Sequence, residues 1–210
     1  KDHPHDQLEF VYPEVNPDDI VIFGSFFAIN PVVRPQVAGF LEYAHNNGAI
    51  LYYDVNFRSQ HKDEIMKITP NLIENLEFAD IVRGSHEDFD ILYKKSDSDK
   101  VYNSEISFYC KKFICTRGSE PVAVRAENGF AKEYDVLKTD TVSTIGAGDN
   151  FNAGFIFGML KYNVTHYDIE NGLNETQWDN LISSGLSFSA ECCKDIYNSV
   201  SCEFGNKMKL

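Results

Sequence analysis

The sequence has few basic residues and no long apolar run, and both shortages exclude classes of function. Its 210 residues include 19 Lys and Arg against 32 Asp and Glu, so the formal net charge is -13. A surface this acidic repels phosphate backbones and anionic lipid, so we expect neither a nucleic-acid nor a membrane partner. The longest apolar run, Phe155 to Leu160, is far shorter than the roughly 20 residues that cross a bilayer.

Cysteines are too few and too irregularly spaced to form a disulfide framework. There are five, an odd number, and no Cys-x-x-Cys pair occurs. A chain of this length also does not need disulfides to fold. No apolar signal-peptide core is present near Lys1. We therefore expect reduced thiols and a cytoplasmic location.

Two common nucleotide-binding motifs are missing as well. The phosphate loop Gly-x4-Gly-Lys-[Ser/Thr] cannot occur, because none of the 13 glycines is followed by lysine. Gly146-Ala147-Gly148 lacks the third glycine of the dinucleotide fingerprint, because Phe151 occupies that position. This segment also lies late in the chain and follows no clean first strand. These observations exclude a P-loop and argue against a dinucleotide fold.

Short apolar runs alternate with segments of helical periodicity along the chain. Apolar residues make up 43% of the sequence, which is enough to build a core. Strands separated by helices predict right-handed parallel crossovers. We expect strands at 19–23, 49–54, 79–82, 113–116, 122–125 and 130–136, and helices at 35–47, 65–76, 149–161 and 176–194, with another helix opening at a capping box over 85–88.

The dipeptide Asn128-Gly129 is the strongest turn signal in the sequence. It separates 122–125 from 130–136 and so predicts a β-hairpin. The fold class is therefore α/β: a three-layer α/β/α arrangement whose sheet is mostly parallel and carries an antiparallel hairpin at its edge. Ligands of such sheets bind beyond the carboxyl ends of the strands. A site is thus expected near those ends and in the loop before Asp149.

The most informative segment is 143–155, where small residues lead directly into a helix. Glycines let the backbone approach an anion closely, and the amides and dipole of a helix N-terminus favour negative charge. Gly146, Ala147 and Gly148 are therefore candidates for an anion hole. Asp149 beside them is a candidate general base for an attacking hydroxyl. The plainer alternative is that Asp149 only caps the helix.

A second polar group follows the strand expected at 49–54. Asp54, Asn56 and Arg58 alternate, so their side chains share one face if the strand continues. Arg58 has a planar fork suited to phosphate or carboxylate. The alternative for Arg58 is that it binds no ligand and is a solvated surface charge or part of a surface ion pair.

These motifs together resemble the ribokinase/PfkB carbohydrate kinase family. Residues 143–156 are similar to its second signature, Asp-Thr-x-Gly-Ala-Gly-Asp-x-Phe, and 54–58 to the Asp-x-Asn-x-Arg segment of fructokinases and 2-keto-3-deoxygluconate kinases. Residues 79–88 resemble the family's strand leading into Asn-x-x-Glu, and 116–118 its Thr-x-Gly nucleotide loop. The resemblance spans nearly the whole chain, from about Asp19 to Lys194.

The resemblance implies a ribokinase-like fold and an ATP-dependent kinase. The enzyme would phosphorylate a hydroxyl on a small sugar, either fructose-like or a keto-sugar acid, with ATP and Mg²⁺. The implied roles are a catalytic base at Asp149, an anion hole at Gly146, Ala147 and Gly148, substrate contacts from Asp54, Asn56 and Arg58, nucleotide contacts from Thr116 and Gly118, and a water-mediated Mg²⁺ contact from Asp88.

Two of the implied nucleotide contacts have plainer alternatives. Thr116 and Gly118 could form only a turn, as most such triplets do. The small residues at 183–189 give the last expected helix a face that could lie against adenine. Close helix packing explains that face equally well.

The sequence also departs from the family pattern. Ser143 and Ile145 replace an Asp and a small or polar residue, and Ser85 and Asp88 stand where Asn and Glu are usual. No counterpart of the N-terminal lobe, with its Gly-Gly sugar motif and β-sheet lid, is found. We therefore expect residues 1–210 to be one α/β kinase domain, the C-terminal two thirds of a longer kinase that could dimerise through the absent lid. The alternatives are a nucleotide-binding pseudokinase, an inactive fragment, or a kinase for a nucleoside or vitamin.

Overall fold

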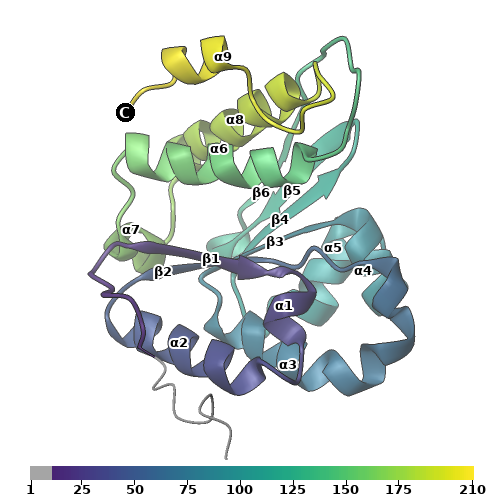
Figure 1. The fold of residues 1–210 in the computed structure, drawn as a ribbon, viewed down its shortest axis with the longest axis vertical. Helices are drawn as coiled ribbons and strands as arrows, with labels where there is room; N and C mark the ends of the chain where they lie inside the picture. Colours follow the sequence, from purple (N-terminus) through teal and green to yellow (C-terminus); the bar gives the residue numbers. More distant parts are fainter. Residues whose placement is uncertain (1–10) are drawn as a thin grey trace, which may run out of the picture.

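A six-stranded sheet lies between two layers of helices in the computed structural model, which describes residues 11–210 (Figure 1). The strands follow one another across the sheet in chain order. The four parallel strands are β1 (Ile20–Gly24), β2 (Ile50–Asp54), β3 (Ile81–Ser85) and β4 (Lys112–Arg117), and the antiparallel ones are β5 (Glu120–Arg125) and β6 (Ala131–Tyr134). The predicted three-layer fold is confirmed. The prediction that no signal peptide is present concerns residues 1–10, which lie outside the described range.

The helices divide between the two faces of the sheet (Figure 1). One face is covered by α1 (Ser25–Ile29), α2 (Arg34–Asn46), α3 (Ile65–Phe78), α4 (His86–Tyr93) and α5 (Ser98–Val101). The other face is covered by α6 (Ala147–Lys161) and α8 (Glu175–Cys192), with α7 (His166–Asn171) at one end and α9 (Cys202–Lys207) outside them. Short 3₁₀ turns at Ser59–Glu64 and Glu127–Gly129 and a π turn at Tyr102–Ile106 complete the set. No helix in the described part of the chain is long and apolar enough to cross a membrane.

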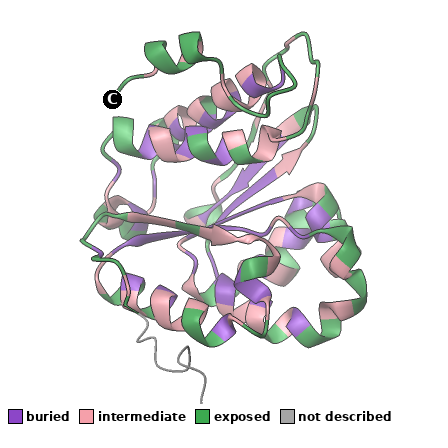
Figure 2. Cartoon of the chain, viewed as in Figure 1, coloured by how far each residue is buried: buried purple, intermediate pink, exposed green. Residues whose placement is uncertain are grey.

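Strand β2 shows why the sheet is buried on both sides (Figure 2). Ile50 and Tyr52 pack into the core under α6 and α8, whereas Leu51 and Tyr53 pack toward the opposite helices. All four are fully buried. A continuous apolar run of this kind is typical of a parallel strand covered on both faces. Strand β1 is less buried than β2. Its only strand partner among the described residues is β2, and its Ile22 is half exposed.

Helices α6 and α8 approach each other closely because small residues face each other at their contact. A Cβ atom on Gly154 would lie 2.5 Å from the Ser184 carbonyl oxygen. A Cβ atom on Gly185 would lie 2.9 Å from the Phe151 ring. At Ser184 and Gly185, the small-residue face predicted at 183–189 therefore serves close helix packing.

Most expected elements are present, with shifts at their ends. Helix α6 begins at Ala147 and not at Asp149, so Asp149 is its third residue. The capping box is confirmed, because the Ser85 hydroxyl accepts from the Asp88 amide while the Asp88 carboxylate accepts from the Ser85 amide. Asn128 and Gly129 both have positive φ, 58° and 76°, as the predicted turn requires.

Replacing Gly154 with alanine is expected to lower the free energy of unfolding by about 1–3 kcal/mol, because the added methyl group meets backbone that cannot move without separating the two helices. The matched control is Gly205→Ala in α9, where an added Cβ has open space around it. That variant is expected to be neutral or to gain about 0.5–1 kcal/mol from helix propensity. Urea denaturation monitored by circular dichroism measures both, and equal midpoints would contradict the packing argument.

Candidate functional site

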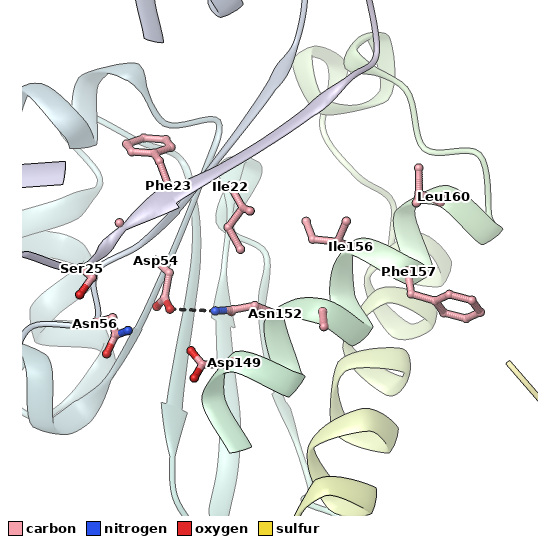
Figure 3. Close-up of a pocket in the computed structure, with 12 residues that line it drawn as sticks. Ile22, Phe23, Ser25, Asp54, Asn56, Asp149, Asn152, Ile156, Phe157 and Leu160 are labelled. Atoms are coloured by element: carbon pink, nitrogen blue, oxygen red, sulfur yellow. Dashed lines mark hydrogen bonds between the residues drawn. The ribbon is translucent and has the colours of Figure 1, made fainter. Parts of the chain in front are cut away.

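Two hollows meet at the carboxyl ends of the central strands. The larger cleft, of about 1820 Å³, extends from the segment after β2 to the C-terminal half of α8. The smaller hollow, of about 630 Å³, lies between β1 and α6 and has a mostly apolar wall that includes Ile22 and Leu160 (Figure 3). Asn56 and Asp149 line both hollows. A group held at their junction can therefore touch molecules bound on either side.

The first turn of α6 forms one wall of this junction. Gly146, its N-cap, has φ 81°, a conformation that strongly favours glycine. The N–H of Ala147 donates to the Thr144 carbonyl at 3.2 Å, whereas those of Gly146, Gly148 and Asp149 have no hydrogen-bond partner among the described residues. Free amides at a helix N-terminus attract an anion. Two residues of the predicted anion hole, Gly146 and Gly148, therefore have amides available to an anion, and the anion hole itself stays a prediction.

The Asp149 carboxylate is exposed and has no hydrogen-bond partner among residues 11–210. It does not accept a bond from the helix amides, so the capping alternative is reduced to an interaction with the helix dipole. In Figure 3 the carboxylate points toward the space below Asp54 and Asn56. Asp149 is therefore free to accept a proton from a molecule bound in that space.

A buried polar network lies directly behind this turn. Arg83 Nη1 donates to Asp54 Oδ1 at 3.0 Å, and Arg83 Nη2 donates to Thr116 Oγ1 at 2.7 Å. Asn152 Nδ2 donates to the second oxygen of Asp54 at 2.8 Å (Figure 3). The Tyr52 hydroxyl lies 3.0 Å from Asn152 Oδ1, and burial raises the pKa of Tyr52, so it remains a donor. The network joins β2, β3 and β4 to α6.

The three predicted substrate residues have different environments. Strand β2 ends at Asp54 and Asn56 has φ 34°, so the condition for a shared face, that the strand continues to Arg58, is not met. Both oxygens of Asp54 are used inside the network, although the residue also lines the smaller hollow. Asn56 lies at the junction, and Arg58 is exposed at the larger cleft. Asn56 and Arg58 are therefore the two with side chains available to a ligand.

Both carboxylate oxygens of Asp88 accept hydrogen bonds from neighbouring residues of the chain. Its Oδ1 accepts from the Phe57 amide at 2.8 Å, and its Oδ2 accepts from the Ser85 amide at 2.7 Å and the Ser85 hydroxyl at 2.8 Å. Burial raises the pKa of Asp88, and the bonds from Ser85 oppose that rise. This carboxylate caps α4 and anchors the segment that follows β2.

A preformed magnesium site is not found in the described part of the chain. Residues 11–210 contain no group of three His, Cys, Asp or Glu side chains that could hold a metal ion. Mg²⁺ is usually held by one or two carboxylates together with substrate phosphates. Because the oxygens of Asp88 are already engaged, these residues do not fit a resident ion, and we assign no step to one.

Thr116 and Gly118 lie at the turn between β4 and β5. The Thr116 hydroxyl is bound by Arg83, and Gly118 has φ 63° with open space around it. Both line the larger cleft together with Ser189 and Ala190 of α8. The turn expected at these residues is present, and the nucleotide contact implied by the family resemblance stays a prediction.

Tyr52, Arg83 and Asn152 are the three network residues that sequence reasoning missed. Arg83 is a charged residue inside a buried strand, which itself signals a buried ion pair because charged side chains are rarely buried alone. Asn152 lies in an apolar segment of α6 beside Phe151, and both are buried. A buried amide in such a place signals a hydrogen-bond partner across the core.

Known proteins match this chain in both sequence and structure. The family model for the pfkB family carbohydrate kinases matches residues 3–174. The 5-dehydro-2-deoxygluconokinase of Geobacillus thermodenitrificans is 28% identical over 149 residues, which cover 68% of this chain and 43% of that protein. The protein of the same name from Bacillus thuringiensis is 26% identical over 149 residues, with 68% and 44% covered. The chain thus spans less than half the length of these relatives.

Two solved structures share the fold. Fructokinase from Vibrio cholerae, with fructose, ADP and calcium bound, superposes with a TM-score of 0.78 at 15% identity and covers 94% of this chain and 63% of its own. Aminoimidazole riboside kinase from Salmonella enterica, with its riboside and an ATP analogue, gives a TM-score of 0.76 at 19% identity, with 94% and 64% covered.

Replacing Asp88 with alanine is expected to lower the free energy of unfolding by about 1–3 kcal/mol, because the amides of Phe57 and Ser85 lose their acceptor. Asp90→Ala in the same helix is the control, since this exposed side chain makes no hydrogen bond among the described residues. Its effect should stay within about 0.5 kcal/mol. Chemical denaturation measures the difference, and equal stability of the two variants would show that the cap is unimportant.

Proposed function

The chain belongs to the pfkB family of carbohydrate kinases, and on this premise we propose that it phosphorylates a hydroxyl group of a small sugar or keto-sugar acid with ATP. The observation that carries the proposal is the position of Asp149, at the junction of two hollows and beside two amides without partners. ATP would occupy the larger cleft and the acceptor the smaller hollow, so that phosphate and hydroxyl meet at the start of α6.

Phosphoryl transfer needs positioning and charge stabilisation more than covalent chemistry. In the proposed reaction Asp149 accepts the proton of the attacking hydroxyl as the oxygen–phosphorus bond forms. The amides of Gly148 and Asp149, with the helix dipole behind them, stabilise negative charge on the transferred group. ADP leaves with the electrons of the broken bond. Mg²⁺ belongs to the proposal only as a partner of the ATP phosphates.

The acceptor that we favour is a keto-sugar acid. Arg58 lines the larger cleft two residues after Asn56, so an acceptor that extends from the smaller hollow through the junction would place a carboxylate on the exposed fork of Arg58. The curated relatives described above are named 5-dehydro-2-deoxygluconokinases, whereas the solved neighbours hold fructose or a riboside. Asn56, at the junction, would contact the acceptor beside the reacting hydroxyl.

Asp149→Asn is expected to lower kcat by about 10²–10⁴-fold and leave ATP binding nearly unchanged, because the amide cannot take up the proton. The assay is ADP release by the full gene product with 5-dehydro-2-deoxygluconate, fructose or a nucleoside as acceptor, beside calorimetric titration with an ATP analogue. Asp140→Asn is the control, because Asp140 is an exposed carboxylate in the preceding loop that lines neither hollow.

The assay distinguishes three alternatives to this proposal: another catalytic base, a pseudokinase and a nucleoside kinase. A variant that keeps more than about a tenth of the wild-type rate removes Asp149 as the base. A wild-type protein that binds the nucleotide but turns over no acceptor is a pseudokinase. Turnover of the nucleoside alone would replace the sugar in this proposal.

Arg58→Lys and Arg58→Ala form a second test. If the guanidinium grips the acceptor carboxylate with two bonds, both variants should raise the KM for the acid about ten-fold or more, because a single ammonium cannot reproduce the fork. The KM for fructose, which has no carboxylate, serves as the reference. Unchanged constants for Arg58→Lys would identify Arg58 as a surface charge.

A further inference from the structure

We propose that Arg83 is a positioning residue for phosphoryl transfer: its guanidinium supports the first turn of α6 and ties the nucleotide cleft to the acceptor hollow. The inference rests on the proposed function of this site. Arg83 belongs to β3 and is not among the site residues that the sequence predicts. Four observations support the inference.

The first observation is contact with the anion-binding turn. A Cβ atom on Gly148 would lie 3.0 Å from Arg83 Nη2 and 3.2 Å from Nη1. The backbone at Gly148 therefore lies against the guanidinium, and a side chain at this position would fit only if Arg83 moved by a few tenths of an ångström. The amides of this turn, which are free to bind an anion, thus have a cation directly behind them.

The second observation is burial. Arg83 is 6% exposed, its Cζ lies 5.9 Å from the centre of the Phe151 ring, and its Nε has no hydrogen-bond partner in the described structure. A charge shielded from water acts more strongly on its neighbours than one at the surface. Asp54 pairs with this charge, but the guanidinium is the member of the ion pair that lies against Gly148. Its field therefore favours negative charge at the turn that Arg83 supports.

The third observation is the direction of the two bonds that Arg83 makes. Nη2 holds Thr116, which lines the larger cleft, while Nη1 holds Asp54, which lines the smaller hollow. Asp54 in turn holds Asn152, three residues after Asp149 on α6. The Arg83 side chain therefore fixes the positions of the larger cleft, the smaller hollow and Asp149 relative to one another.

The fourth observation is a contrast with Arg34, one of two other arginines that are buried to a similar extent. Arg34 is 7% exposed and donates to Ala28 O at 2.8 Å and Asn75 Oδ1 at 2.5 Å, but it lines neither hollow. It lies in the helical layer on the far side of the sheet. Arg34 is thus a structural arginine without access to the site, which makes it a matched control.

The test compares Arg83→Lys, Thr116→Val and Arg34→Lys in the full gene product. Lysine keeps the charge but cannot bridge Asp54 and Thr116, so Arg83→Lys should lower kcat about 100-fold, as expected for a displacement of about 1 Å in a reacting group. Its KM for the acceptor should stay within about 3-fold, since binding is retained. Arg34→Lys should lower the melting temperature with kcat changed by less than about 3-fold.

A second readout does not depend on turnover. Because the turn supported by Arg83 acts on the terminal phosphoryl group, Arg83→Lys should weaken binding of a non-hydrolysable ATP analogue about ten-fold relative to ADP, the cost of one weakened charge-assisted contact. Isothermal titration calorimetry measures both nucleotides. An unchanged ratio of the two affinities, as expected for Arg34→Lys, would overturn the proposal.

If Arg83→Lys does not fold, Thr116→Val decides the question, because it removes one bond of Arg83 and leaves the Asp54 pair intact. A kcat for Thr116→Val within about 3-fold of wild type, with the nucleotide ratio unchanged, overturns the positioning role. A wild-type protein that phosphorylates no acceptor refutes the proposed function alone. The nucleotide ratio then still tests Arg83, so the two failures are distinguishable.

Discussion

The ion pair between Asp54 and Arg83 is the interaction on which the site depends. Two charges this deeply buried are tolerated only when they are paired and their remaining hydrogen-bonding groups are largely satisfied. Thr116 and Asn152 supply the additional bonds. Because these partners come from β4 and α6, the pair is satisfied only when the ends of three strands and the first turns of α6 are in their native positions. Formation of the site and completion of the fold are thereby linked.

The layers of the fold were predictable because their signals are local. An apolar run such as the one in β2 identifies a buried strand by itself, and the turn at Asn128 and Gly129 needs only its own two residues. The predictions failed where the backbone leaves a regular pattern. Asn56 adopts a left-handed conformation, so the alternation of 54–58 stops after the strand ends. Helix α6 starts two residues early because Ala147 and Gly148 already have helical geometry.

The candidate site was predictable only in part, for a related reason. Asp149 and the glycines before it form one short segment whose chemistry can be read from the sequence. Asp54 is paired with a residue 29 positions away and bonded to another 98 positions away. No local pattern specifies such partners, since they meet only after the sheet and α6 have packed. The cap formed by Asp88 was predictable from its own segment, whereas its bond to the Phe57 amide, 31 positions away, was not.

The free edge of β1 has a consequence for association. Edge strands of soluble proteins are usually protected by charged residues, proline or a bulge, but Ile20–Gly24 contains neither charge nor proline and pairs regularly with β2. Its outer backbone groups have no strand partner among residues 11–210. Another strand could extend the sheet there, and it would run beside Ile22, a wall of the hollow that contains Asp149. Sheet extension at this edge would therefore also reshape the acceptor hollow.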